Sequence, residues 1–83
     1  MPRYFLHLRD GTDEVLDDEG IEFDDIEALK KAVLHSARDI MGNELRSGGV
    51  VDLRYRIDAE NEEGQVAYSL PFRHAVNIIP ERD

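Results

Sequence analysis

Near the start of the chain an apolar residue recurs at every second position, which is the pattern of a half-buried β-strand. In residues 4–9, every second side chain is a Tyr or a Leu, and the residues between them fall on the other face. An Asp-Gly dipeptide follows and favours a tight turn. Residues 14–16 then supply a short return strand. The sequence therefore opens with a predicted β-hairpin.

The spacing of apolar residues changes to steps of three and four over residues 26–45, which indicates an amphipathic helix. An extended lead-in over residues 21–23 precedes it. Asp24 is the predicted N-cap, and Glu27 stands three residues later, as in a capping box. A Ser-Gly-Gly sequence is the predicted stop. We therefore expect one helix over about residues 25–46.

Alternation with a period of two returns after the helix, in residues 53–60 and again in residues 65–70. The loop between them ends in Gly64, and Pro71 ends the second strand because proline cannot donate a ladder hydrogen bond. The element order is thus β-β-α-β-β. It predicts an α+β two-layer sandwich, in which a four-stranded, mainly antiparallel sheet of strand order 2-1-3-4 carries one long helix on one face.

The 83 residues leave room for a single domain, spanning residues 1–83. Its predicted core consists of the apolar residues on the helix stripe and on the strand faces toward it, which are Tyr4, Leu6, Leu8, Ile26, Leu29, Val33, Ala37, Ile40, Leu53, Tyr55, Ile57, Val66, Tyr68 and Leu70. Residues 72–79 are too apolar for a free tail. We expect this apolar C-terminal segment to dock on the body of the domain or on a dimer mate.

Acidic residues are concentrated in one part of the chain, which begins at Asp10 and ends at Glu27. This acidic stretch contains ten acids and no Lys or Arg, whereas the rest of the chain has nine acids and ten bases. The stretch therefore accounts for the whole net charge of −9. Such a charge argues against nucleic-acid phosphates as partners, and it favours a basic protein partner or simple solubility.

The composition of the chain also indicates the cellular compartment of the protein. The chain has no cysteine, which excludes disulfides and thiol chemistry and fits a reducing compartment. Its apolar runs are only a few residues long, and its first residues lead directly into a strand pattern. We therefore expect a cytoplasmic protein that does not bind membranes.

Patterns of catalytic or metal-ligating residues do not stand out. Neither Gly20 nor Gly64 has the acids around it that an EF-hand needs, and the three histidines lack zinc-motif spacing. The sequence also lacks a nucleophile elbow and a phosphate-binding glycine loop. Weak binding of divalent cations by Asp17, Asp18 and Glu19 is an alternative to a solvated turn. We expect no enzyme activity, no metal and no cofactor.

One group of residues forms a candidate interaction surface on the sheet face away from the helix. Arg54 and Arg56 would lie beside the first-strand residues if the first and third strands are neighbours. An aromatic ring among cations can stack on nucleobases, but the net charge favours cross-strand ion pairs, with Phe5 covered by residues 72–79 or by a dimer mate. With the apolar segment included, the candidate surface comprises Phe5, His7, Arg9, Arg54, Arg56, Phe72, Val76, Ile78 and Ile79.

The chain opens with PRYFLHLRDG at residues 2–11, and it has a DEG turn at residues 18–20 and a hairpin from Ile57-Asp58 to Glu63-Gly64. These three parts resemble a family of small bacterial proteins that is common in alphaproteobacteria. Members of that family share a PRYFFHLRDG-type opening, a DEEG turn, an Ala-rich helix and a DEDG-type late hairpin. The resemblance implies a similar fold and no particular activity, since the family has no assigned function. It gives no guide to residues 72–79.

Two functions are compatible with these observations. The first is a noncatalytic interaction module that self-associates, for example as a homodimer, through the outer sheet face and the apolar segment. The second is an acidic, antitoxin-like or inhibitor-like protein that neutralises a basic protein partner through the acidic stretch. An enzyme would instead need a cleft with convergent polar groups.

Overall fold

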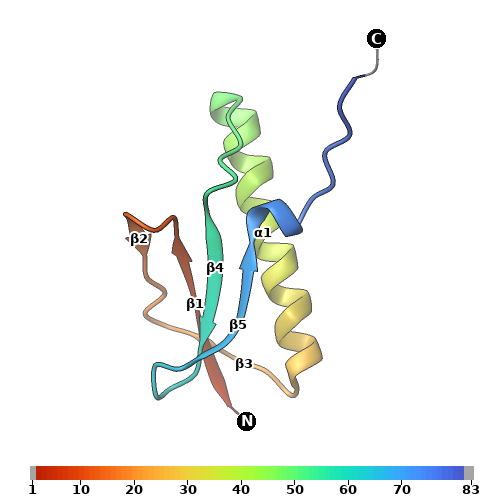
Figure 1. The fold of residues 1–83 in the computed structure, drawn as a ribbon. Coiled ribbons are helices and arrows are strands. Elements are labelled where there is room, and N and C mark those ends of the chain that lie inside the picture. The colour runs from red at the N-terminus through yellow and green to blue at the C-terminus, as the bar shows by residue number, and fades with distance from the viewer. Residues whose placement is uncertain (1, 82–83) are drawn as a thin grey trace.

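The computed structural model describes residues 2–81 and shows one long helix packed on a mainly antiparallel sheet (Figure 1). The elements, in chain order, are β1 (Arg3–Arg9), β2 (Glu14–Val15), β3 (Ile21–Glu22), α1 (Ile26–Gly48), β4 (Arg56–Glu60), β5 (Val66–Pro71) and the 3-10 helix η1 (Phe72–His74). The strand order is β2-β1-β4-β5, and β3 also pairs with β1. The predicted α+β fold and the predicted strand order are confirmed.

β1 is paired with three other strands, β2, β3 and β4. It pairs with β4 on one side, while β2 and β3 pair with its two ends on the other side. Between β2 and β3, residues 16–20 leave the ladder, and the Asp17 carboxylate takes the place of a backbone acceptor for the Leu6 N–H at 3.2 Å. The acidic stretch is therefore folded along one edge of the sheet.

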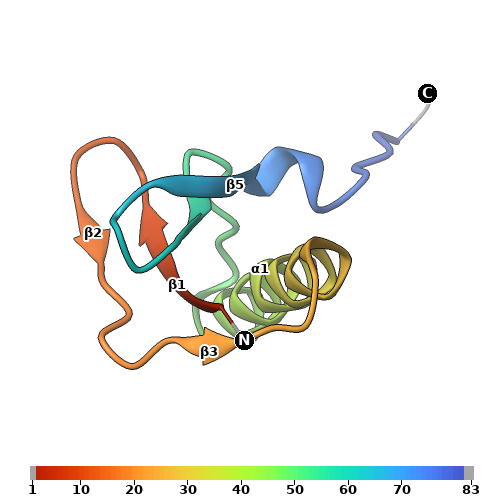
Figure 2. The ribbon, with the colours of Figure 1, turned by 90° about the horizontal axis from the view of Figure 1, so that it is seen from below.

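The core lies between α1 and the side of the sheet formed by β4 and β5. Buried residues recur every four positions along the helix, at Leu29, Val33, Ala37 and Met41. They pack against Ile57, Ala59, Leu70, Phe72 and Ala75. Seen from below, α1 lies much nearer to β5 than to β2 (Figure 2). The helix-facing side of β1 is consequently less well covered, and its Leu6 and Leu8 are only half-buried.

Two residues expected in the core are exposed. Val66 is 55% exposed because the β4–β5 ladder has an irregularity at which the alternation slips by one residue. Glu60 pairs with Val66, although Ala59 pairs with Tyr68, so the valine moves to the face away from the helix. Ile26 is 41% exposed and is the first residue of the helix, one turn before the first buried position.

The helix boundaries differ from the predicted ones at both ends. Asp25, not Asp24, is the N-cap, and its carboxylate accepts the Ala28 N–H at 2.8 Å. Adjacent aspartates offer the same chemistry, so the choice depends on the backbone, which stays extended through Asp25. With this cap, Glu27 no longer holds the third helical position, and the predicted capping box is wrong. At the other end, the left-handed Gly49 (φ 69°) caps the helix.

The strand predicted over residues 53–60 is shorter in the structure and begins at Arg56. Asp52 causes the difference, because its carboxylate accepts the backbone N–H of Arg54 at 3.0 Å. This local hydrogen bond turns the chain at residues 53–54, ahead of the ladder.

α1 is much longer than the strands on which it packs. Its 23 residues at about 1.5 Å each make a helix of about 35 Å, whereas the seven residues of β1 at about 3.3 Å each span about 23 Å. The C-terminal turns of the helix therefore extend beyond the sheet, as the upper part of Figure 1 shows. We call these turns, residues 41–48, the overhang. Residues 49–55 lead back from it to β4.

Candidate functional site

The outer face of the sheet carries an ion-pair network at the place where the sequence suggested an interaction surface. Asp58 is at its centre and is only 4% exposed. Its carboxylate accepts hydrogen bonds from Arg9 at 3.0 Å, from Arg56 at 3.1 Å and from the Ser69 hydroxyl at 2.6 Å. Arg9 also donates to Glu60 at 2.6 Å. The cross-strand charge ladder favoured by the sequence is therefore present.

The network favours the charged forms of Asp58 and Arg9. Burial by itself raises the pKa of Asp58, but the hydrogen bonds from Ser69, Arg9 and Arg56 together outweigh burial and hold that pKa below its usual value. Hydrogen bonds to Glu14, Glu60 and Asp58 raise the pKa of Arg9. These charged groups therefore satisfy one another across the sheet.

Phe5 and His7 belong to the same face and are held by the acidic stretch. The His7 Nδ1 accepts the Asp17 N–H at 3.1 Å, and its Nε2 lies 3.5 Å from a Glu60 carboxylate oxygen. The rings of Phe5 and His7 are stacked, with centroids 6.4 Å apart. Gly20 covers Phe5 so closely that a Cβ there would lie 2.9 Å from the ring. Within the chain, Gly20 and not residues 72–79 lies against Phe5, so the intramolecular expectation is wrong, and cover by a dimer mate stays a prediction.

The remaining predicted surface residues lie elsewhere. Arg54 is in the turn before β4 and pairs with Asp52, not with the outer face of the sheet. Phe72 is 2% exposed within the core. Ile78 and Ile79 are 64% and 81% exposed, on a C-terminal segment that runs away from the body in both ribbon views. The structure thus brings together the β1 residues and Arg56, but neither Arg54 nor the C-terminal segment.

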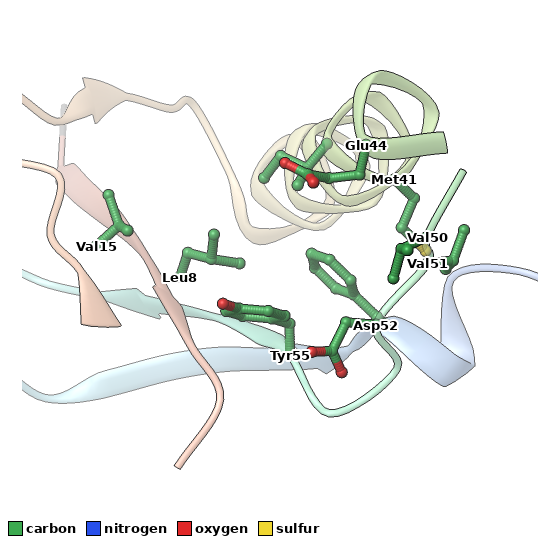
Figure 3. A pocket seen from close by; sticks show the side chains of 10 residues that line it. Leu8, Val15, Met41, Glu44, Val50, Val51, Asp52 and Tyr55 are labelled. Atoms are coloured by element: carbon green, nitrogen blue, oxygen red, sulfur yellow. The ribbon is translucent and has the colours of Figure 1, made fainter. Parts of the chain in front are cut away.

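An apolar groove lies under the overhang, between α1 and the ends of β1 and β2 (Figure 3). Its volume is about 370 Å³. The lining residues are Leu8, Val15, Ile40, Met41, Glu44, Val50, Val51, Asp52, Tyr55 and Phe72. Two of the apolar residues at its rim, Val15 and Val50, are 66% and 62% exposed. The groove exists because the helix extends past the ends of the strands, which leaves its C-terminal turns uncovered by the sheet.

A second, shallower groove of about 320 Å³ lies against the same part of the helix. Its lining includes Leu45, which is 56% exposed, and the C-terminal Val76 and Ile78. The two grooves share Met41 and Val51. The overhang is therefore bordered by apolar surface on both sides, with Val15, Leu45, Val50 and Ile78 exposed around it.

Two carboxylates border the first groove, one from the helix and one from the returning loop. Glu44 belongs to the overhang, and Asp52 lies on the opposite side of the groove, beside Tyr55 (Figure 3). The side chain and the backbone N–H of Arg54 lower the pKa of Asp52 to about 2, so this carboxylate stays ionised. The groove thus combines an apolar floor with two carboxylates at its rim, of which Asp52 is paired with Arg54.

The acidic stretch has largely structural roles. Asp10 accepts the N–H groups of Thr12 and Asp13, which lower its pKa. Burial raises the pKa of Asp17, but backbone N–H groups, among them that of Gly20, reverse the effect and lower it. Asp25 caps α1. Among residues 2–81, no group of three or more His, Asp or Glu side chains is arranged to hold a metal ion. Nor does this described part contain a helix that is long and apolar enough to cross a membrane.

Comparison with protein families adds one finding. The model of a family described as Domain of unknown function (DUF6894) matches residues 3–73. The chain belongs to this family. All the residues that line the first groove of this DUF6894 domain lie within the match, whereas Val76, Ile78 and Ile79 lie beyond it. No curated protein and no solved structure matches the chain.

The sequence did not reveal the groove, although two signals for it were present. The predicted helix was already longer than any predicted strand, which implies an overhang. Val50 and Val51 follow the helix stop directly and precede the predicted strand, so they are apolar residues outside any element. In this chain, these two signals together locate the groove.

Proposed function

We propose that this domain is a noncatalytic protein-interaction module whose contact surface is the apolar groove under the overhang. The observation that carries the proposal is the exposure of Val15 and Val50, at 66% and 62%, at the rim of one apolar groove, with the 56% exposed Leu45 in the second groove beside it. Single exposed apolar side chains are common on soluble proteins, but a contiguous apolar surface around a hollow is typical of binding sites.

The noncatalytic part of the proposal is supported by how the polar groups are used. The Ser69 hydroxyl donates to Asp58, and not to a histidine that could act as its base. The imidazole of His7 is held between a backbone N–H and Glu60. These side chains lie on the outer face, whereas the groove opens on the helix side, so the two are not parts of one site.

The two hypotheses from the sequence, self-association and neutralisation of a basic protein, are supported to different degrees. Self-association remains a proposal, now through the overhang and the exposed end of the C-terminal segment in place of the outer face. Neutralisation of a basic protein by the acidic stretch remains a prediction. It has less support, because Asp10, Asp17 and Asp25 are engaged in capping backbone N–H groups.

Site-specific photo-crosslinking in the cells that make the protein tests the proposal. A benzophenone amino acid replaces Val50 at the groove rim or, as a matched control, Val66 on β5. Both valines are more than half exposed, at 62% and 55%. We expect a discrete protein adduct, either with another protein or with a second copy of the chain, from position 50 and not from position 66. Absence of an adduct at position 50, or the same adduct from both positions, would refute the proposal.

A further inference from the structure

The charges around the groove indicate which kind of partner fits it. Glu44 on the helix side and Asp52 on the loop side place carboxylates on two borders of an apolar floor. The negative end of the helix macrodipole also lies here, because α1 ends at Gly48. A cation next to this groove is therefore attracted by Glu44 and by the C-terminal end of the helix.

One of the two carboxylates, Asp52, is already paired with a cation of the chain, which leaves Glu44 as the carboxylate that a partner can meet. Arg54 is the cation at this rim, and its guanidinium is bound by Asp52 through hydrogen bonds of 2.8 and 3.0 Å. The hydrogen bonds and the charge of Asp52 raise the pKa of Arg54 and keep the pair intact. Glu44 has no such cation among the ion pairs of residues 2–81. It is exposed at the rim and available to a positively charged group of a partner.

The volume of the groove suits side chains and not a whole folded element. About 370 Å³ is at the small end of the range found for ligand sites, roughly 300–1,000 Å³. It accommodates a few aliphatic side chains from one segment of a partner. The backbone of that segment would lie across the rim, near Val15 and Val50, where its flanking residues meet the carboxylates.

We propose that the groove binds a cationic amphipathic segment of a partner protein, with large aliphatic side chains on the apolar floor and Lys or Arg side chains over Glu44. This inference rests on the proposed function and specifies its partner. A second copy of the chain is the main competing occupant. Each copy carries a net charge of −9, so like charges oppose that association, whereas charge complementarity favours the cationic segment.

The test is a titration of the complete, ¹⁵N-labelled chain with three synthetic helical peptides, followed by NMR. The first probe is built from Leu and Lys in an amphipathic pattern. The second keeps every Leu and replaces each Lys by Glu, and the third keeps every Lys and replaces each Leu by Gln. The variant Glu44→Gln removes the free rim charge. Its matched control, Glu62→Gln, removes an exposed charge in the β4–β5 loop, away from the groove.

We expect the Leu/Lys peptide to shift the amide signals of Leu8, Val15, Val50 and Val51 and to bind at least tenfold more tightly than the Leu/Glu peptide. The Lys/Gln peptide should leave those four signals in place. Glu44→Gln should weaken binding of the Leu/Lys peptide at least threefold at low salt, and Glu62→Gln should not. The difference between the two variants should shrink as salt is added.

Other outcomes overturn the inference in distinguishable ways. Equal affinity for the Leu/Glu peptide would mean that the groove binds apolar segments regardless of charge. Groove signals that move on dilution without any peptide would identify a second copy as the occupant. Both results would contradict the cationic partner and leave the proposed function standing. Shifts confined to residues 10–27 would place cation binding on the acidic stretch and refute the inference. If no peptide and no dilution affects the groove signals, and position 50 gives no adduct, the proposed function fails as well.

Discussion

Replacing Asp58 by Asn should destabilise the domain more than the loss of any exposed ion pair. Asp58 is 4% exposed and accepts hydrogen bonds from Arg9, Arg56 and Ser69. Breaking a buried ion pair on one side typically costs about 3–5 kcal/mol, because the partner charge is left buried without compensation. Here the cost should be lower. Arg9 still has Glu60, and the Arg56 side chain is 40% exposed and can be hydrated.

We therefore expect Asp58→Asn to lower the free energy of unfolding by about 2–3 kcal/mol. A domain of this size unfolds in urea with a slope of about 1 kcal/mol per M, so the midpoint should fall by about 2–3 M. Equilibrium urea unfolding, followed by circular dichroism, measures it. Asp39→Asn is the control, since it removes one partner of an exposed helical pair and should change stability by less than about 0.5 kcal/mol. Equal midpoints for the two variants would refute the view that the outer-face network stabilises the fold.

Three further predictions concern stability. Asp25→Ala should cost about 0.5–2 kcal/mol in the same urea assay, because a first-turn N–H loses its acceptor, whereas Asp24→Ala should cost clearly less. Gly20→Ala should lower the thermal midpoint more than Gly11→Ala, because both glycines have positive φ but only at Gly20 would a Cβ meet other atoms within 4 Å. The folded-state pKa of Asp58 lies below its unfolded value, so its stabilising contribution is complete above about pH 4–5 and is lost as the pH falls through the folded pKa. Acid titration should therefore destabilise the wild type more than Asp58→Asn, and parallel pH profiles would contradict this.

The architecture followed from the sequence because periodicity reports burial directly. The buried helix positions Leu29, Val33 and Ala37 were all on the predicted stripe. The strand order was predictable because an antiparallel arrangement of two hairpins places the first and third predicted strands side by side. The position of Val66 was not predictable, since one extra residue in the ladder reverses the faces of a strand and leaves no mark in the alternation itself.

The candidate surface was harder to predict, because side chains choose their partners only after the fold is formed. Arg9 and Arg56 were correctly placed on one face, but Asp58 and Glu60 form ion pairs with them there and neutralise their charge. Arg54 was misplaced because Asp52 turns the chain before the strand begins. Such a local hydrogen bond competes with strand pairing, and the alternating pattern does not register it.

The groove arises because α1 is longer than the strands on which it packs. A pattern of buried positions along the sequence does not report the relative lengths of the elements. Met41 continues the helix stripe and is buried, yet it also lines both grooves from beneath. The stripe therefore predicted a packed residue correctly and did not show that the surface beside it stays open. Comparing the predicted rise of the helix with that of the strands would have shown it.

The central claim is tested most directly by measuring binding of the partner, the protein that crosslinks at position 50, to two variants of the chain. The variants are Val50→Asn and Val66→Asn, and the measured quantity is the dissociation constant. Both substitutions replace a valine that is more than half exposed, and neither side chain is part of the buried core. If the groove is the contact surface, Val50→Asn should raise the dissociation constant at least tenfold, whether the partner is another protein or a second copy of the chain, and Val66→Asn should leave it within twofold. Equal dissociation constants for the two variants would contradict the claim.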